Sequence, residues 1–322
     1  MSADSSTATR TVPVLVPTPS PEPYTYALEE GMRVSPGAIL QVPLGPRQVP
    51  GVVWDGAGEG AAVDPNKLRP VSAVFDCPPL TEDMRRFIGW VARYTLSAPG
   101  MVARMVMRVP AAFEPEPPVP GLQLTDKRPD RMTAARERVL ALAAESSPMA
   151  WTRSGLAHAA GVSLSVVDGL TKAGAFEAIA LPPQPVVATP DPAYGTPDLR
   201  DEQAQAARTL ADEVAAHAFS VTLLEGVTGA GKTEVYFEAI AAALAAGRQV
   251  LVMLPEIALT QSFIDRFEAR FGAPPAPWHS DLPPKLREKV WRQAAEGSVR
   301  VVAGARSALF LPFADLGLIV VD

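Results

Sequence analysis

The chain of 322 residues has a single cysteine, Cys77, and no apolar run of membrane-spanning length. One cysteine excludes an internal disulfide framework and any multi-cysteine zinc site. We expect Cys77 to be a small buried hydrophobic residue. The N-terminal segment also lacks the basic and apolar regions of a secretion signal. We therefore expect a cytoplasmic protein that makes no membrane contact.

An excess of positive charge is also missing, because 29 basic residues stand against 35 acidic ones and give a net charge of −6. Residues 1–110 contain ten of each sign. Proteins that hold nucleic acid mainly by its phosphates usually carry a basic domain. The net charge therefore does not identify the binding partner, and any contact with DNA must come from local patches of side chains.

Proline is abundant, with 34 residues, and marks the boundaries of the chain. Hydrophobic residues make up 48% of the sequence, which is typical of globular domains rather than disorder. Proline clusters at 110–120 and 182–197 indicate extended, semi-rigid linkers. They divide the chain into candidate domains at 1–110, 125–181 and 198–322.

The first segment is predicted to be a small β-rich domain followed by helices. Its expected strands are residues 12–15, 24–26, 38–43, 48–54 and 67–75. Thr81 is the expected cap of a helix over 82–94. Tyr24 and Tyr26 are candidates for stacking on bases, although alternation along a strand equally allows them to be core residues. Arg47, beside the predicted Gly45-Pro46 turn, is a candidate phosphate contact.

The second segment predicts a winged helix. Helical patterns cover 133–144, 153–160 and 164–173, and an apolar strand is expected at 176–181. The presumed recognition helix has only one cation, Lys172. The winged helix could therefore either contact DNA or only pack against neighbouring domains, and the sequence allows both.

The third segment contains a complete G-x-x-x-x-G-K-T phosphate loop between an apolar run, 221–224, and a helical pattern, 235–246. Its residues are Gly226-Val227-Thr228-Gly229-Ala230-Gly231-Lys232-Thr233. Loop amides and the helix N-terminus attract phosphate, and Lys232 is suited to the β- and γ-phosphates. Thr233 is the expected ligand of Mg²⁺. The sequence therefore predicts ATP and Mg²⁺ as cofactors.

Strand and helix patterns alternate through this segment, which predicts a parallel sheet covered on both faces. The expected strands are residues 221–224, 249–254, 276–279, 299–303 and 317–322. The last strand ends at Asp322, which has the form of the second nucleotide motif, whose carboxylate holds Mg²⁺. Overall we expect a multidomain α/β protein with a partial RecA-like motor lobe, whose catalytic residues include Lys232 and Asp322.

Three runs in this segment resemble the PriA family of primosomal replication-restart helicases (primosomal protein N′). They are the phosphate loop with its flanks, 223–236, the Pro-Glu-Ile run at 252–260, and the Arg-Ser-Ala-Leu-Phe run at 304–313. The family places a DNA 3′-end-binding domain and a winged helix before its motor, as expected here. The family's usual Phe-Asp-Tyr run is replaced by Tyr24-Thr25-Tyr26. Thr25 thus stands where the family has the Asp that reads the terminal nucleotide, and whether this chain recognises a DNA 3′ end stays open.

The resemblance also implies roles for four further motor residues. Gln203 stands where such helicases contact adenine, although a solvated position in a first helical turn is the alternative. The resemblance implies single-stranded DNA contacts for Glu256 and Thr260. Arg306 is implied to contact phosphate or couple the lobes, and a solvated arginine is the alternative.

The resemblance ends at Asp322, so we expect an N-terminal fragment without the second lobe, its arginine finger and the zinc-binding domain that would hold Zn²⁺. It implies an ATP-dependent 3′→5′ DNA helicase at stalled forks, acting on branched and single-stranded DNA. The implied partners are primosome proteins and single-stranded-DNA-binding protein. The fragment itself is expected to hydrolyse little ATP. A non-catalytic fork-binding scaffold with nucleotide as a regulatory ligand, and a P-loop ATPase of another kind, are the alternatives.

Overall fold

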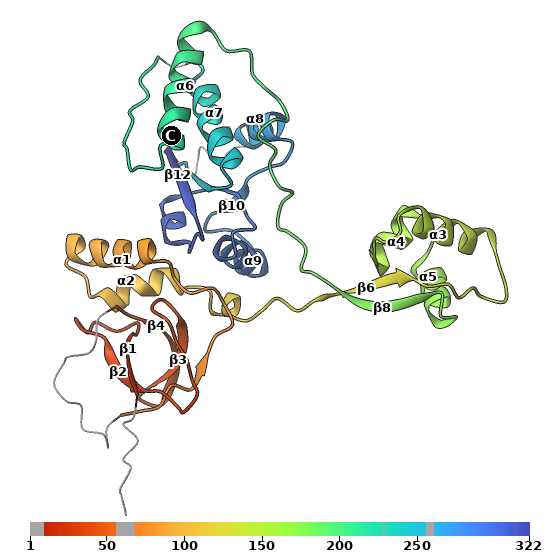
Figure 1. Ribbon diagram of the computed structural model, residues 1–322, viewed down its shortest axis with the longest axis horizontal. Helices are drawn as coiled ribbons and strands as arrows, with labels where there is room; N and C mark the ends of the chain where they lie inside the picture. Colours follow the sequence, from red (N-terminus) through yellow and green to blue (C-terminus); the bar gives the residue numbers. More distant parts are fainter. Residues whose placement is uncertain (1–9, 56–67, 228, 256–260) are drawn as a thin grey trace, which may run out of the picture. The chain divides into compact units, whose positions relative to one another are not determined.

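The computed structural model describes residues 10–55, 68–227, 229–255 and 261–322. The chain forms two compact units. One unit joins residues 1–115 to residues 185–322, and the other covers residues 116–184. Antiparallel and parallel sheets occur together with helices, so the prediction of a multidomain α/β protein is confirmed (Figure 1).

The N-terminal part is an antiparallel sheet with the strand order β2-β1-β4-β3-β5. Its strands are β1 (Thr11–Leu15), β2 (Tyr24–Ala27), β3 (Ile39–Leu44), β4 (Arg47–Val53) and β5 (Ala73–Val74). The predicted hairpin is present, since β3 pairs with β4 from Ile39↔Val52 to Leu44↔Arg47. Gly45 in its turn has a positive φ of 60°, which favours glycine. The strand expected over 67–75 is wrong in extent, because only β5 forms within its described residues.

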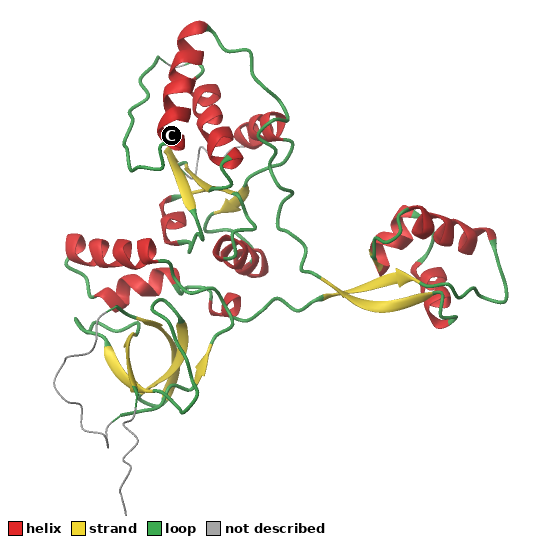
Figure 2. Ribbon diagram, viewed as in Figure 1, coloured by secondary structure: helices red, strands yellow, loops and turns green. Residues whose placement is uncertain are grey.

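Helices follow this sheet (Figure 2). Thr81 caps α1 (Glu82–Thr95) as predicted, and its hydroxyl accepts a hydrogen bond from the Met84 amide. The helix α2 (Pro99–Val106) and the short 3₁₀ helix η2 (Pro110–Phe113) continue the chain. Buried side chains from α1, α2 and η2 share one core with Ile39 and Val52 of the sheet.

The second unit has three helices and a small antiparallel sheet, the arrangement expected of a winged helix. The helices are α3 (Ala134–Glu145), α4 (Arg153–Ala159) and α5 (Leu164–Lys172). The strands are β6 (Val119–Leu124), β7 (Trp151–Thr152) and β8 (Phe176–Leu181), in the order β7-β6-β8. The interpretation of 110–120 as an extended linker is therefore corrected, because residues 110–113 form η2 and residues 119–120 already belong to β6, which pairs with β8.

The motor part has a parallel sheet with the order β10-β11-β9-β12. Its strands are β9 (Gln249–Met253), β10 (Ala276–Trp278), β11 (Val301–Gly304) and β12 (Leu316–Val321). Its helices are α6 (Asp201–Ala215), α7 (Lys232–Ala245), α8 (Gln261–Phe271) and α9 (Pro284–Ala295), with the 3₁₀ helix η4 (Arg306–Phe310). Val250 and Val252 pack with α7 and α8, whereas Leu251 packs with α9. Both faces of the sheet are thus covered, as predicted.

The strand expected at 221–224 is absent from the structure. Val221 and Leu223 are 85% and 80% exposed, and the segment has no regular structure. The Ser220 and Thr222 hydroxyls instead donate hydrogen bonds to Glu213 on α6. A strand needs a paired neighbour for its backbone groups, and β12 pairs only with β9 among the described strands. The apolar run therefore lies outside the sheet.

One core joins the N-terminal and motor parts of the first unit. Trp291 on α9 is 1% exposed, and its indole Nε1 donates a 2.8 Å hydrogen bond to the Val106 carbonyl. Its ring meets Phe113 edge-on, with ring centroids 5.2 Å apart. Cys77 packs against the same core, and burial raises the pKa of its thiol to about 11. The described helices include none long and apolar enough to cross a bilayer.

Candidate functional site

The phosphate loop leads directly into α7, so its backbone amides lie at a helix N-terminus. Gly229 and Gly231 have positive φ values of 78° and 79°. A Cβ on Gly231 would lie 2.3 Å from the side-chain nitrogen of Gln203. Only glycine satisfies both demands there. Thr228 lies outside the described residues, and Val227 is exposed.

Lys232, the first residue of α7, folds its side chain back over the loop. Its Nζ donates to the Gly226 carbonyl at 2.8 Å and to the Val227 carbonyl at 3.3 Å. These two oxygens hold the ammonium where a phosphate oxygen can replace them. The loop thus combines a helix N-terminus and a lysine, which is the donor set that a triphosphate requires.

Gln203 on α6 is tied to the same loop. Its amide nitrogen donates to the Ala230 carbonyl at 2.8 Å, and its amide oxygen accepts from the Arg200 backbone at 3.0 Å. The side chain therefore fixes the start of α6 against the loop. The solvated alternative is excluded, while the predicted adenine contact stays a prediction.

The two residues predicted for Mg²⁺ come together at one cavity. Thr233 and Asp322 both line a hollow of about 270 Å³ beside Pro255, Ser262 and Arg266. The Asp322 amide donates to the Met253 carbonyl at 3.1 Å, which extends the pairing of β12 with β9. No cluster of three metal-ligating side chains occurs within the described residues. One hydroxyl and one carboxylate, completed by nucleotide phosphates and water, fit the way Mg²⁺ is held.

Arg266 on α8 was not identified from the sequence. It pairs with Glu234 on α7 at 2.5 Å. Burial raises the pKa of the Glu234 carboxyl, but the Arg266 hydrogen bond and charge, with a backbone hydrogen bond, lower it overall. The cation stands at the rim of the cavity that holds Thr233 and Asp322. In the sequence, Arg266 is one polar residue of an amphipathic helix, and nothing in that pattern predicts that it lies at this cavity.

Three motor residues were predicted to contact DNA. Glu256 and Thr260 lie outside the described residues. Arg306 begins η4, immediately after β11, and its side chain is exposed. Its predicted role is compatible with that exposure and stays a prediction.

The two tyrosines of β2 have opposite surroundings. Tyr24 is 41% exposed, whereas Tyr26 is 4% exposed and belongs to the core of the sheet. The Tyr26 hydroxyl donates a 3.1 Å hydrogen bond to the Pro43 carbonyl. The stacking role predicted for Tyr26 is therefore wrong, because its ring is enclosed in the core. Tyr24 lies on the same face of β2, but it is the first residue of the strand and stays open to solvent. Tyr24 keeps its candidate role, and Thr25 between them is half-buried.

Arg69, which was not identified from the sequence, lies at the β3–β4 turn. Its guanidinium donates a 2.8 Å hydrogen bond to the carbonyl of Gly45 in the β3–β4 turn. Burial raises the pKa of Tyr26, the neighbouring Tyr24 adds to the rise, and the charge of Arg69 opposes it. Arg47 follows the same turn and is exposed. Arg47 and Arg69 thus put two cations at the β3–β4 turn. The register instead aligns the exposed ring of Tyr24 with Val14 and Val53 at the other end of β4.

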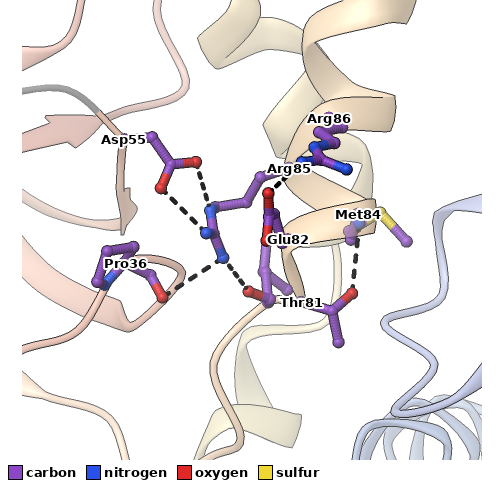
Figure 3. A network of polar contacts seen from close by, with 8 residues as sticks. Pro36, Asp55, Thr81, Glu82, Met84, Arg85 and Arg86 are labelled. Atoms are coloured by element: carbon purple, nitrogen blue, oxygen red, sulfur yellow. Dashed lines mark hydrogen bonds and ion pairs between the residues drawn. The ribbon is translucent and has the colours of Figure 1, made fainter.

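Arg85 on α1 is a structural arginine (Figure 3). Its guanidinium binds both oxygens of Asp55, at 2.7 and 3.0 Å, and donates to the Leu80 carbonyl at 2.7 Å. A longer contact of 3.5 Å reaches the Pro36 carbonyl. The side chain is 11% exposed. The network ties the end of the hairpin to the start of α1.

The outer face of α1 carries an aromatic pair that the sequence analysis also missed. Trp90 and Tyr94 stack with centroids 5.0 Å apart and are 52% and 76% exposed. Their spacing of four residues places them on one helix face. Exposed aromatic rings of this kind mark α1 as a surface with binding capacity.

Comparisons with known proteins agree with these two sites. Residues 13–108 match the 3′DNA-binding domain (3′BD) family of PriA, and residues 200–322 match the DEAD/DEAH box helicase family. The replication restart protein PriA of Rickettsia felis is 29% identical over 298 residues, which cover 92% of this chain. The chain is thus similar to PriA along almost its whole length.

Other PriA proteins match shorter or gapped stretches. That of Rickettsia conorii is 51% identical over 126 residues, covering 39% of this chain and 19% of the relative. That of Synechocystis is 27% identical over 384 residues, covering 93% of this chain and 45% of the relative. For the R. felis PriA the matched share of the relative is 34%. The chain thus spans less than half the length of these PriA relatives.

Proposed function

We propose that this chain is the DNA-end-binding and first motor part of an ATP-dependent 3′→5′ DNA helicase that recognises stalled replication forks and initiates primosome assembly. The observation that carries the proposal is that Thr233, the last residue of the phosphate loop, and Asp322 line one cavity. The similarity to PriA proteins and the DEAD/DEAH box helicase match support the reaction class.

In this proposal, Lys232 exchanges its two loop carbonyls for the β- and γ-phosphate oxygens of ATP. Thr233 and Asp322 would hold Mg²⁺, which when bound neutralises charge on the phosphates. Gln203 contacts the loop through Ala230, so adenine bound by Gln203 would influence the conformation of the loop. Catalysis by Lys232 and Asp322 is thus positioning and charge stabilisation.

On the DNA side, the exposed ring of Tyr24 and the two cations at the β3–β4 turn, Arg47 and Arg69, supply recognition. A segment with balanced charge gains little from counterion release, so shape and a few stacked groups must carry its affinity. The proposed ligands are branched DNA ends and single strands, with Arg306, Glu256 and Thr260 on the motor side. The resemblance adds primosome proteins and single-stranded-DNA-binding protein as partners, Zn²⁺ in a further domain, and a cytoplasmic location.

Lys232→Ala tests the nucleotide site. We expect binding of a fluorescent ATP analogue to fall at least about tenfold, because charge-assisted hydrogen bonds to phosphate are lost. Lys172→Ala, an exposed lysine of the second unit, is the matched control and should bind as the parent does. Equal titration curves for the parent and Lys232→Ala would contradict the assignment of the loop.

A second candidate function is a fork-binding scaffold in which nucleotide is a regulatory ligand. The exposed, unpaired 221–224 segment favours it, since the strand beside the phosphate loop is not built into the sheet. Because the matched relatives are longer, strand separation is measured on the full-length gene product. DNA-stimulated ATP hydrolysis that Lys232→Ala abolishes supports the motor. Fork binding that responds to nucleotide without hydrolysis supports the scaffold.

A further inference from the structure

Tyr236 lies on α7 one turn after Thr233 and is 7% exposed. Its hydroxyl is 2.8 Å from Oδ2 of Asp322 at the end of β12. Residues three apart on a helix lie on the same face, so the ring extends beside Thr233 toward the sheet. A single phenol thus connects the helix that begins at the phosphate loop with the carboxylate opposite it.

The direction of this hydrogen bond follows from the groups themselves. An ionised carboxylate only accepts, so the Tyr236 hydroxyl donates to Asp322. The phenol oxygen then has lone pairs left on the side of Thr233, whose neighbouring hydroxyl acts to lower the pKa of the phenol. Oδ1 of Asp322 has no part in the contact with Tyr236.

We propose that Tyr236 is a positioning residue that holds the Asp322 carboxylate, across the cavity from Thr233, in the orientation that receives Mg²⁺. The proposal rests on the proposed function of this loop as an ATP·Mg²⁺ site. Without the phenol, the carboxylate loses its hydrogen-bond donor and is free to rotate.

The ring of Tyr236 is anchored independently of its hydroxyl. It packs edge-on against Phe237 with centroids 5.4 Å apart and belongs to the core formed by α7, α8 and β9. A buried tyrosine hydroxyl also needs a partner for stability alone. The test must therefore separate an effect on Mg²⁺ from an effect on folding.

Tyr236→Phe keeps the ring and removes only the hydroxyl. The binding of a fluorescent ATP analogue is titrated with EDTA and then across a Mg²⁺ series. We expect unchanged affinity in EDTA and about a tenfold smaller enhancement by Mg²⁺, the loss typical of a hydrogen bond to a charged group. Tyr194→Phe, which alters a 65% exposed tyrosine, is the control and should keep the full enhancement.

A double-mutant cycle with Asp322→Asn makes the result specific. If Tyr236 acts through Asp322, the double variant should lose no more Mg²⁺ enhancement than Asp322→Asn alone. Additive losses, or a Tyr236→Phe protein with the parent's Mg²⁺ response, overturn the proposal. A parent chain that binds no nucleotide refutes the proposed function itself, and this inference with it.

A second measurement applies if Tyr236→Phe folds poorly. The five tyrosines are replaced by 3-fluorotyrosine, and the ¹⁹F resonances are followed during the same additions. One buried resonance should move when Mg²⁺ joins the nucleotide and stay fixed with nucleotide alone. If no ¹⁹F resonance changes its chemical shift when Mg²⁺ is added, the proposal is overturned.

Discussion

At the scale of single residues, the structure separates side chains that the sequence presents as equivalent. Tyr24 and Tyr26 are two apart on one short strand, yet the first is exposed and the second is core. Thr233 and Asp322 show the opposite case, because residues far apart in the chain line one cavity. Residues two apart on a strand point to the same face, so position along β2 separates the two rings: Tyr24 is its first residue, whereas Tyr26 lies within it and contacts Pro43.

Tyr24→Ala should weaken binding to fork DNA by about 1–3 kcal/mol, since a stacked base loses its aromatic partner. The salt dependence should barely change, because no phosphate contact is removed. Tyr26→Phe should leave DNA affinity unchanged and lower the free energy of unfolding by about 1 kcal/mol, because its hydrogen bond to Pro43 is lost.

Arg47→Ala is the matched comparison for these tyrosine variants. It should weaken fork and blunt duplex alike and flatten the salt slope by about one unit. Fluorescence anisotropy across a salt series distinguishes the three variants. Equal affinity of the parent for fork and blunt duplex would remove the case for structure-specific recognition.

At the scale of elements, local patterns predicted what local forces determine. The Thr81 cap, the Gly45-Pro46 hairpin and the alternation of the motor strands all form, because their geometry is fixed within a few residues. The 221–224 run fails for the opposite reason, since an apolar segment becomes a strand only where another strand pairs with it. The β6 strand was hidden within proline-rich sequence, and its partner β8 lies far along the chain.

Arg85→Lys tests how α1 is held against the sheet. Lysine keeps the charge but cannot bind both oxygens of Asp55 while also reaching the Leu80 carbonyl. We expect the free energy of unfolding to fall by about 1–3 kcal/mol in urea denaturation. Arg86→Lys, a neighbouring arginine that is 73% exposed, should change it by less than about 0.5 kcal/mol. Equal effects would show that Arg85 acts only as a surface charge.

At the scale of the whole molecule, the first unit is discontinuous in sequence. Residues 185–322 return to pack against residues that precede the second unit. Trp291 and Phe113 are the centre of that contact. The N-terminal part and the motor part therefore share hydrophobic burial, and unfolding of one should expose the face of the other.

Cys77 should react slowly with iodoacetamide because burial raises the pKa of its thiol to about 11. At pH 8 its alkylation should be on the order of 100-fold slower than that of glutathione, since only the thiolate reacts. The rate should rise about tenfold per pH unit up to the raised pKa, as followed by mass spectrometry. A rate equal to that of glutathione at pH 8 would show that the thiol is freely solvated.

The labelling rate of Cys77 can also be used to follow local opening of the protein. Opening of the core around Cys77 restores the ordinary pKa of its thiol, so at fixed pH the labelling rate rises with the fraction of molecules that are open. No other cysteine contributes signal. A time course at fixed pH therefore reports changes in local opening where the two parts meet, without denaturant. Fork DNA or ATP that couples the parts would lengthen the labelling half-life, and Trp291→Ala would shorten it.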